Sequence, residues 1–319
     1  MNIEIGAPVY NEESGITVFL TALETEISEI TRNDPGIKFS LLLVNDGSSD
    51  KTLEIIKKFP YHCFVNVRII SFSRNFGHSA AISALIDNSE ADALLLMDAD
   101  MQDTPKVLAE LVRKWKEGFQ SVQVVRTKRS ESLVFRFGHF IYSKIFTLLS
   151  GLRSDVGIFG IYDSDVIQSV RSYPERLRFI PGIISSAGFK KDYVSAPRDK
   201  RLDGNSKVGF SGLIRLGLLA WFSYSSIPIH LITGVGVLIS FLSFFAGIVV
   251  IIIKLATDMA IPGWASLLSA QFFLGGLIIL SLGVLGQYIG IIFQEVKQRP
   301  VYLVADVIHM TGEDSGTQK

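Results

Sequence analysis

Four short polar segments in the first 103 residues combine carboxylates with amides, hydroxyls and glycines, and each follows an apolar run. They are Tyr10–Glu13, Asn45–Asp50, Ser73–His78 and Asp98–Asp103. In the last segment, Asp98 and Asp100 stand two residues apart, which suits a hard divalent cation that also binds phosphate oxygens. Clustered carboxylates repel one another unless a cation or a ligand offsets their charge. The segments therefore predict a site for a metal ion and a phosphorylated ligand.

These segments also have a purely structural interpretation. Asp46–Asp50 can turn the chain and cap a helix that begins near Lys51, and Thr104–Pro105 is a typical helix start. The Asp-x-Asp pattern is short and frequent, so the spacing of Asp98 and Asp100 by itself leaves metal binding and a structural role open. Capping does not explain why carboxylates follow several apolar runs.

Five apolar runs, separated by amphipathic stretches, are the strands that we expect to position these segments. They are residues 3–9, 39–45, 67–72, 93–97 and 120–125. Short buried strands that alternate with helices indicate a doubly wound, mainly parallel sheet, which binds ligands at the carboxyl ends of its strands. Because the polar segments follow the first four runs, they are expected to meet at one edge of the sheet.

Basic residues form a second set that could contact a phosphate. Arg126, Lys128, Arg129 and Arg136 follow the fifth run, and Arg198, Arg201 and Lys207 come before the apolar C-terminal part. Arginine presents a fork of donors that matches phosphate oxygens. The alternative is that several of these side chains contact anionic lipid headgroups at a membrane surface. For a single arginine, the sequence leaves both interpretations open.

Apolar residues are concentrated in the C-terminal part of the chain. Of 319 residues, 48% are hydrophobic and 19% are charged, and the mean hydropathy is +0.35, yet only nine charged residues follow Ile229. The uncharged runs 229–253 and 259–294 can each cross a hydrocarbon core of about 30 Å, whereas two buried soluble helices would need an unusually large core. Because Ile261–Gly263 resembles a turn, we expect spans over about 229–253 and 264–294.

Charge and cysteine content predict the compartment. Lysines and arginines gather before the first span and after the second, while the loop between them holds only Lys254 and Asp258. This places the polar part and both termini in the cytoplasm, in a multi-pass protein of the inner (plasma) membrane. The single Cys63 and the lack of a signal-peptide pattern agree with a reducing compartment. With 31 basic and 31 acidic residues, a nucleic-acid partner is not expected.

Two aromatic-rich segments, 133–149 and 210–224, have the composition of helices that lie on a bilayer, although soluble core helices would look the same. The small residues Gly286 and Gly290 offer a close helix contact in the second span. Packing within the hairpin and contact in a homo-oligomer both satisfy this pattern.

In combination, these features resemble the family 2 inverting glycosyltransferases. The motifs that carry the resemblance are Pro8–Glu13, Val44–Asp50, Arg74–His78 and Met97–Asp103. Arg198–Lys207 is similar to the Arg-rich Gly-x-Ser-Lys segment of the polyprenyl-phosphate hexose synthases. That group includes dolichyl-phosphate mannose synthase and bacterial undecaprenyl-phosphate glucosyltransferases, and the two-helix hairpin resembles the bacterial members. The resemblance covers most of the chain.

The resemblance implies an α/β GT-A fold, which is Rossmann-like with a mainly parallel sheet. The catalytic domain would cover residues 1–207 and an amphipathic juxtamembrane segment residues 208–228. Two transmembrane helices would follow within 229–295, and residues 296–319 would form a cytoplasmic tail.

The resemblance also implies roles for individual residues. Nucleotide-sugar binding is assigned to Pro8, Tyr10, Glu12, Asp46, Arg74, Gly77, Asp98, Ala99 and Asp100. A Mg²⁺ or Mn²⁺ ion is assigned to Asp98, Asp100 and Gln102. The acceptor phosphate is assigned to Arg126, Arg129, Arg136, Arg198, Arg201 and Lys207. The implied catalytic residues are Asp98, Asp100, Arg126, Arg129, Arg136 and Arg201.

The implied reaction is an inverting transfer of one hexose to polyprenyl (undecaprenyl) phosphate at the cytoplasmic membrane face. UDP-glucose is preferred as the donor, with GDP-mannose as the alternative. A processive polysaccharide synthase and a noncatalytic membrane scaffold are less favoured, because a Gln-x-x-Arg-Trp motif is absent and Asp98 and Asp100 are present. Gly157–Gly160 replaces an expected Gly-Asp-Phe-Arg acceptor loop, so only Asp155 receives a weak role there.

Overall fold

A computed structural model of the chain describes most of its polar part and its C-terminal helix. The described residues are 1–101, 104–127, 156–175, 178, 180–197, 234–236, 238–239, 241–242, 245 and 263–311. The chain divides into two compact units. Met1–Lys207 and Arg299–Lys319 form the first unit, and Val208–Gln298 forms the second.

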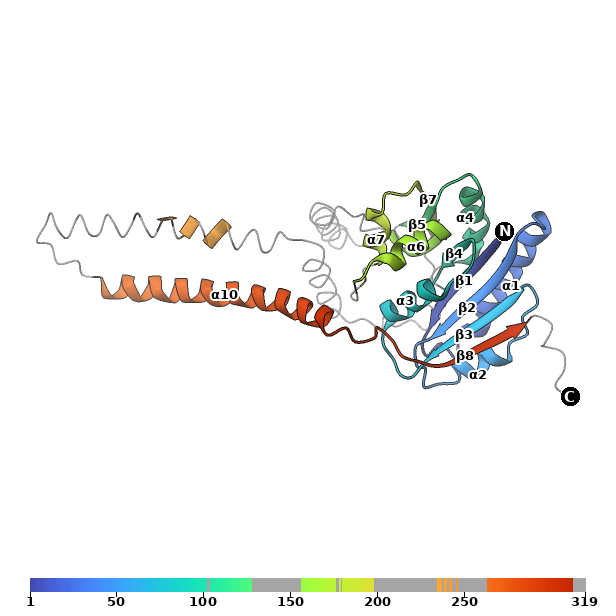
Figure 1. Cartoon of the computed structure of the whole chain (residues 1–319), viewed down its shortest axis with the longest axis horizontal. Coiled ribbons are helices and arrows are strands. Elements are labelled where there is room, and N and C mark those ends of the chain that lie inside the picture. Colours follow the sequence, from blue (N-terminus) through green and yellow to red (C-terminus); the bar gives the residue numbers. More distant parts are fainter. Residues whose placement is uncertain are drawn as a thin grey trace, which may run out of the picture. The chain divides into compact units, whose positions relative to one another are not determined.

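An eight-stranded sheet forms the centre of the first unit (Figure 1). Its strands are β1 (Asn2–Val9), β2 (Lys38–Asn45), β3 (Asn66–Phe72), β4 (Ala93–Leu96), β5 (Ser121–Thr127), β6 (Val156–Asp163), β7 (Lys191–Pro197) and β8 (Val304–Thr311). Their order across the sheet is β7-β5-β6-β4-β1-β2-β3-β8. Strands β4, β1, β2 and β3 are adjacent and parallel, as are β5 and β7, whereas β6 and β8 run antiparallel to their neighbours.

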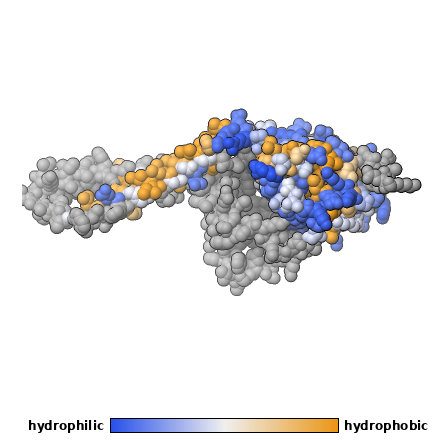
Figure 2. All heavy atoms as spheres, turned by 90° about the horizontal axis from the view of Figure 1, so that it is seen from below, coloured by the Kyte–Doolittle hydropathy of each residue, from blue (hydrophilic) through white to orange (hydrophobic). Residues whose placement is uncertain are grey.

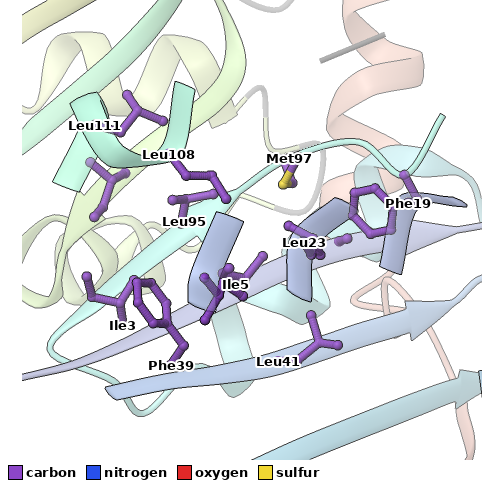
Figure 3. Close-up of a cluster of buried hydrophobic side chains, with 14 of the residues drawn as sticks. Ile3, Ile5, Phe19, Leu23, Phe39, Leu41, Leu95, Met97, Leu108 and Leu111 are labelled. Carbon is purple, nitrogen blue, oxygen red and sulfur yellow. The ribbon is translucent and has the colours of Figure 1, made fainter. Parts of the chain in front are cut away.

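Helices cover both faces of the sheet. They are α1 (Ile16–Asn33), α2 (Thr52–Lys58), α3 (His78–Asn88), η1 (Pro105–Val107), α4 (Leu108–Lys116), α6 (Ser164–Ser172) and α7 (Ile180–Ser186). Side chains of α1 and α4 pack on one face, where Phe19 and Leu108 join Leu41 of β2 (Figure 3). Helices α3, α6 and α7 pack on the other face, around Leu42 of the same strand. Successive side chains of a strand point to opposite faces, so a strand covered on both faces is a nearly continuous apolar run.

The five strands predicted from the sequence are confirmed, with ends that differ by at most two residues. The mainly parallel α/β sheet is confirmed as well. Strands β6, β7 and β8 were not predicted. Residues 157–160, which stand where an acceptor loop was expected and to which no acceptor role was assigned, lie within β6 between β4 and β5. The segment is therefore a strand and not a loop, and Phe159 and Gly160 are buried inside the sheet.

The segment expected to be a C-terminal tail contributes to the sheet. Residues 304–311 form β8, which pairs antiparallel with β3 from Phe72 opposite Val304 to Asn66 opposite Thr311. The chain after α10 therefore returns to the first unit as an edge strand. Its carboxyl terminal residues 312–319 lie outside the described residues.

The described part of the second unit is dominated by α10 (Trp264–Val296). Its segment Phe273–Phe293 has a mean hydropathy of 2.1 and none of it is buried, so by length and composition it can cross a membrane. Large apolar side chains such as Phe273 and Ile279 are exposed, and the helix presents a mostly hydrophobic surface (Figure 2). The predicted span 229–253 and the segments 133–149 and 210–224 lie mainly or wholly outside the described residues.

Candidate functional site

The four polar segments lie at one edge of the sheet. Each follows one of the adjacent parallel strands β1, β2, β3 and β4, whose carboxyl ends point the same way. The register places Val9, the last residue of β1, opposite Asn45, the last residue of β2. The sheet thus brings together side chains that are up to 90 residues apart in the sequence, as the alternation of strands and helices predicts.

The loops after β1 and β2 are joined by reciprocal hydrogen bonds. The backbone N–H of Asn11 donates to Ser48 Oγ at 3.0 Å, and the N–H of Ser49 donates to Asn11 Oδ1 at 2.9 Å. Asn11 has a φ of 51°, a left-handed conformation that asparagine tolerates better than most residues. This conformation places the Asn11 amide against the second loop, and the hydrogen bonds join the two loops.

The same two loops also start α2. Asp50 Oδ1 accepts a 3.0 Å hydrogen bond from the Thr52 N–H, and its Oδ2 accepts one from the Glu13 N–H at 3.1 Å. Thr52 Oγ1 accepts from the N–H of Glu12 at 2.9 Å. Burial alone would raise the pKa of Asp50, but hydrogen bonds from Thr52 and Glu13 outweigh it and lower the pKa. Asp50 therefore supports the start of α2 from the position before its N-cap residue, Lys51. This role does not extend to Asp46.

Asp46 is 3% exposed and holds the loop after β3. Its Oδ1 accepts from the Phe76 N–H at 2.7 Å, and its Oδ2 accepts from the Gly77 N–H at 2.9 Å. Burial raises the pKa of this carboxyl, and the two backbone hydrogen bonds and the charge of nearby His78 counteract the shift. A carboxylate has about four lone-pair sites, so both oxygens can still accept a further hydrogen bond from a ligand.

The pKa shift of Asp46 leads to a stability prediction. Below about pH 4, the usual Asp pKa, the carboxyl is protonated in both the folded and the unfolded chain. As the pH rises, the unfolded chain loses this proton first, so the folded chain holds more protons and its free energy of unfolding decreases until the raised pKa is passed. Asn cannot titrate. Melting temperatures measured upward from pH 4 should therefore fall for the wild type relative to Asp46→Asn, and a constant difference would contradict the assigned shift.

Gly47 allows the loops after β2 and β3 to touch. Its φ is +65°, and a Cβ placed on it would lie 2.3 Å from the carbonyl carbon of Arg74 and 2.6 Å from the nitrogen of Asn75. Real Cβ atoms do not approach backbone this closely. Glycine at this position is therefore required both by the backbone conformation and by the contact that brings Asp46 to the N–H groups of Phe76 and Gly77.

Asp98 and His78 connect the fourth segment to the third. His78 is the first residue of α3, and its Nε2 lies 3.7 Å from Asp98 Oδ1. Asp98 and Asp100 are half-buried, and Ala99 between them is buried. His78 was not among the site residues predicted from the sequence. The signal was its position directly after Gly77, at the start of a helix that follows a site loop.

Two carboxylates at this edge have the chemistry to hold a divalent cation together with a phosphorylated ligand. Among the residues that the structure describes, no group of three or more His, Cys, Asp and Glu side chains is arranged to hold a metal. Asp98 and Asp100 place two carboxylates at this edge, and Mg²⁺ is commonly held by one or two carboxylates together with substrate phosphates. Gln102, the third predicted ligand, lies outside the described residues.

Other predicted donor residues line the same edge. Pro8 lies near the end of β1, and Tyr10, directly after the strand, is 38% exposed. The exposed Arg74 places its guanidinium 4.1 Å from the centroid of the Phe76 ring, and its Nη1 donates to the carbonyl oxygen of Asn75 at 3.1 Å. A cation held over a ring by such contacts has a restricted orientation.

The predicted acceptor residues are mostly outside the described part of the chain. These are Arg129, Arg136, Arg198, Arg201 and Lys207, and Asp155 is outside as well. The backbone of Arg126 lies in β5, opposite Ala196 of β7. The structure thus brings together the predicted donor residues, while the roles of the basic residues remain predictions.

Comparison with known proteins identifies the family of the chain. Residues 5–171 match the model of glycosyl transferase family 2. The chain is 37% identical to an uncharacterized glycosyltransferase of Bacillus subtilis, over 94% of this chain and 92% of that protein. It is 34% identical to the bactoprenol glucosyl transferase of Shigella phage SfII, over 95% of this chain and 97% of that protein. A solved mannosyltransferase of Pyrobaculum calidifontis, in complex with GDP-Man and Mn²⁺, covers 93% of this chain and 88% of its own at 13% identity and a TM-score of 0.45. The family model and the two relatives at 37% and 34% identity show that the chain belongs to glycosyl transferase family 2 and is a glycosyltransferase.

Proposed function

We propose that this glycosyltransferase moves one hexose from a nucleotide sugar to a polyprenyl phosphate at the cytoplasmic face of the membrane. The observation that carries the proposal is the match along nearly the whole chain to a protein named bactoprenol glucosyl transferase. The apolar helix α10 supports it, because an enzyme that acts on a membrane lipid benefits from an anchor that keeps it at the bilayer. In this proposal, 229–253 and 264–294 form the membrane hairpin, and both termini are cytoplasmic.

The donor would bind at the carboxyl ends of β1 to β4. Pro8, Tyr10 and Glu12 would contact the nucleoside, and the buried carboxylate of Asp46 would accept a hydrogen bond from its base. Asp98 and Asp100 would hold Mg²⁺ or Mn²⁺, which when bound stabilises negative charge on the donor diphosphate. The imidazole of His78, with its Nε2 3.7 Å from Asp98 Oδ1, would add a hydrogen-bonding group beside the diphosphate.

The acceptor phosphate would act as the nucleophile without a general base. A phosphate monoester has a second pKa of about 6 and is mostly dianionic at neutral pH, so it needs no proton removal before attack. One of its oxygens forms a bond to the anomeric carbon, while the bond from that carbon to the diphosphate oxygen breaks and the diphosphate leaves with the electron pair. Attack from the opposite face inverts the configuration.

A donor screen tests the reaction class and the sugar together. Full-length protein in detergent, with Mg²⁺ and undecaprenyl phosphate, is expected to convert radiolabelled UDP-glucose into chloroform-extractable label. GDP-mannose is the main comparison, and a higher rate with it would move the assignment to a mannosyltransferase. Absence of extractable label with all common nucleotide sugars, while free phosphate acceptors are also unused, would contradict the proposed function.

Arg201→Ala is expected to affect the lipid acceptor more than the donor. Loss of one bidentate guanidinium contact to phosphate costs roughly 1.5–3 kcal/mol, which corresponds to about a tenfold or larger increase in the KM for undecaprenyl phosphate. The KM for UDP-glucose should stay near its wild-type value. Arg201→Lys keeps the charge but not the fork and should recover only part of the loss. A larger change in the donor KM would place Arg201 at the donor site instead.

A further inference from the structure

An aromatic stack joins Tyr302, which follows α10, to the loop Ser73–Gly77 after β3, which is called the donor loop below. The ring of Tyr302 stacks on Phe72, the last residue of β3, with centroids 4.9 Å apart and planes at 12°. Phe72 meets Phe76 edge to face at 5.7 Å and 89°. Phe76 is the residue whose N–H donates to Asp46, and its ring lies under the guanidinium of Arg74. The stack therefore ends at Phe76, which contacts two predicted donor-binding residues, Asp46 and Arg74.

Two hydrogen-bonding contacts also connect residues 302 and 303 to β3, its following loop and α3. The Ser73 N–H, at the start of the donor loop, donates to the carbonyl oxygen of Leu303 at 3.0 Å. Asn88 Nδ2, at the end of α3, lies 3.4 Å from the Tyr302 hydroxyl, which it can donate to. Tyr302 thus contacts both the strand that leads into the loop and the far end of the helix whose first residue is His78.

We propose that Tyr302 is a positioning residue for the donor site: its ring holds Phe72 and Phe76, and thereby keeps the loop Ser73–Gly77 in the conformation that presents two N–H groups to Asp46. The inference rests on the proposed function, because it takes the edge around Asp46 as the donor site. It adds that the segment that follows the membrane helix is a part of the donor-binding apparatus.

A core-packing role alone would make a different prediction. The half-buried Tyr302 packs against the second hydrophobic cluster, so removing its ring must cost some stability in either case. Only a positioning role predicts that donor binding weakens beyond what an equal loss of stability causes. Met310 supplies the comparison, because it lies in β8, the strand that follows Tyr302, opposite Val67 of β3, and is half-buried against the first cluster.

The experiment compares Tyr302→Ala, Tyr302→Phe and Met310→Ala in the full-length protein. Initial rates with UDP-glucose at saturating undecaprenyl phosphate give the donor KM and kcat. Hydrogen exchange of peptides that cover 73–77 reports on the loop without any ligand, and melting temperatures report on stability.

Tyr302→Ala is expected to raise the donor KM roughly three- to tenfold, the size of the loss of one aromatic pair, with little change in kcat. Exchange in 73–77 should become faster. Tyr302→Phe, which keeps the ring, should behave like the wild type, and Met310→Ala should lower the melting temperature without changing the donor KM or loop exchange.

Equal effects of Tyr302→Ala and Met310→Ala on donor KM and on loop exchange would overturn the inference, since the ring would then contribute only stability. If the wild type transfers no sugar from any donor, the proposed function fails. The exchange measurement then still decides whether Tyr302 orders the loop, because unchanged exchange in Tyr302→Ala overturns the positioning role and faster exchange supports it.

Discussion

Asp100→Ala is expected to lower kcat by about 10²–10³-fold, the size of effect seen when one preorganised group that stabilises transition-state charge is removed. In the proposed function, Asp98 and Asp100 are the two carboxylates that hold the cation, and both follow β4 at the site edge. Loss of one of two carboxylates should therefore remove most of the cation affinity. The measurement is the rate of lipid-linked label formation at saturating donor across a Mg²⁺ and Mn²⁺ titration.

Asp92→Ala is the matched control for Asp100→Ala. Asp92 is an exposed carboxylate at the opposite end of the same strand, where its Oδ2 accepts from the Asn2 N–H at 2.8 Å. The substitution Asp92→Ala removes the same charge as Asp100→Ala but at the end of β4 away from the site, so the activity should stay near the wild-type rate. An Asp100→Ala protein that melts like the wild type and retains a third or more of its activity would show that Asp100 does not have the assigned role.

The sequence predicts the strands that the core determines. Leu41 and Leu43 of β2 pack on one face of the sheet while Leu42 and Val44 pack on the other, so burial on both faces produces an apolar run that is visible without coordinates. Strand β8 lacks this signal, because it is an edge strand with exposed Val304 and Val307, and its partner β3 lies far away in the sequence. The pairing of such distant segments is decided by tertiary contacts that local composition does not encode.

Strand β6 was missed for a related reason. Its Gly160 has backbone so close to β5 that a Cβ would lie 2.4 Å from the Val122 carbonyl oxygen. Two glycines in a short segment favour a loop when propensity alone is considered, whereas here one of them is required by close strand approach. The family motif expected at these positions also favoured a loop, although its acidic and basic residues are missing here.

The sequence predicted which strand ends form the candidate site. It did not predict the hydrogen bonds between the loops that follow those strands. In a parallel sheet, the segments after adjacent strands must meet, so Asp46, Asp98 and Asp100 could be grouped from their positions in the sequence. The hydrogen bonds that shape the edge depend on loop backbone instead. Asn11 at a positive φ and Asp46 under the N–H of Phe76 are such features, because neither follows from residue type or spacing.

Gly47→Ala is expected to raise the KM for UDP-glucose by about tenfold or more, which corresponds to about 1.4 kcal/mol or more of lost binding. The added Cβ would meet the backbone of Arg74 and Asn75 at 2.3 and 2.6 Å, so the loops after β2 and β3 must separate. Separation lengthens the hydrogen bonds from Phe76 and Gly77 to Asp46, which are 2.7 and 2.9 Å in the intact site. Donor kinetics and melting temperature measure the two consequences.

Gly118→Ala separates this contact from backbone strain. Gly118 also has a positive φ, +88°, but a Cβ there would meet nothing within 4 Å. The left-handed conformation costs a non-glycine residue roughly 1–2 kcal/mol, so Gly118→Ala should lower stability by about that amount and leave the donor KM unchanged. Gly47→Ala carries the same strain together with the clash, and only the clash moves the loop that Asp46 holds. If both variants lose stability equally and neither changes the donor KM, the two loops do not need their close contact to bind the donor.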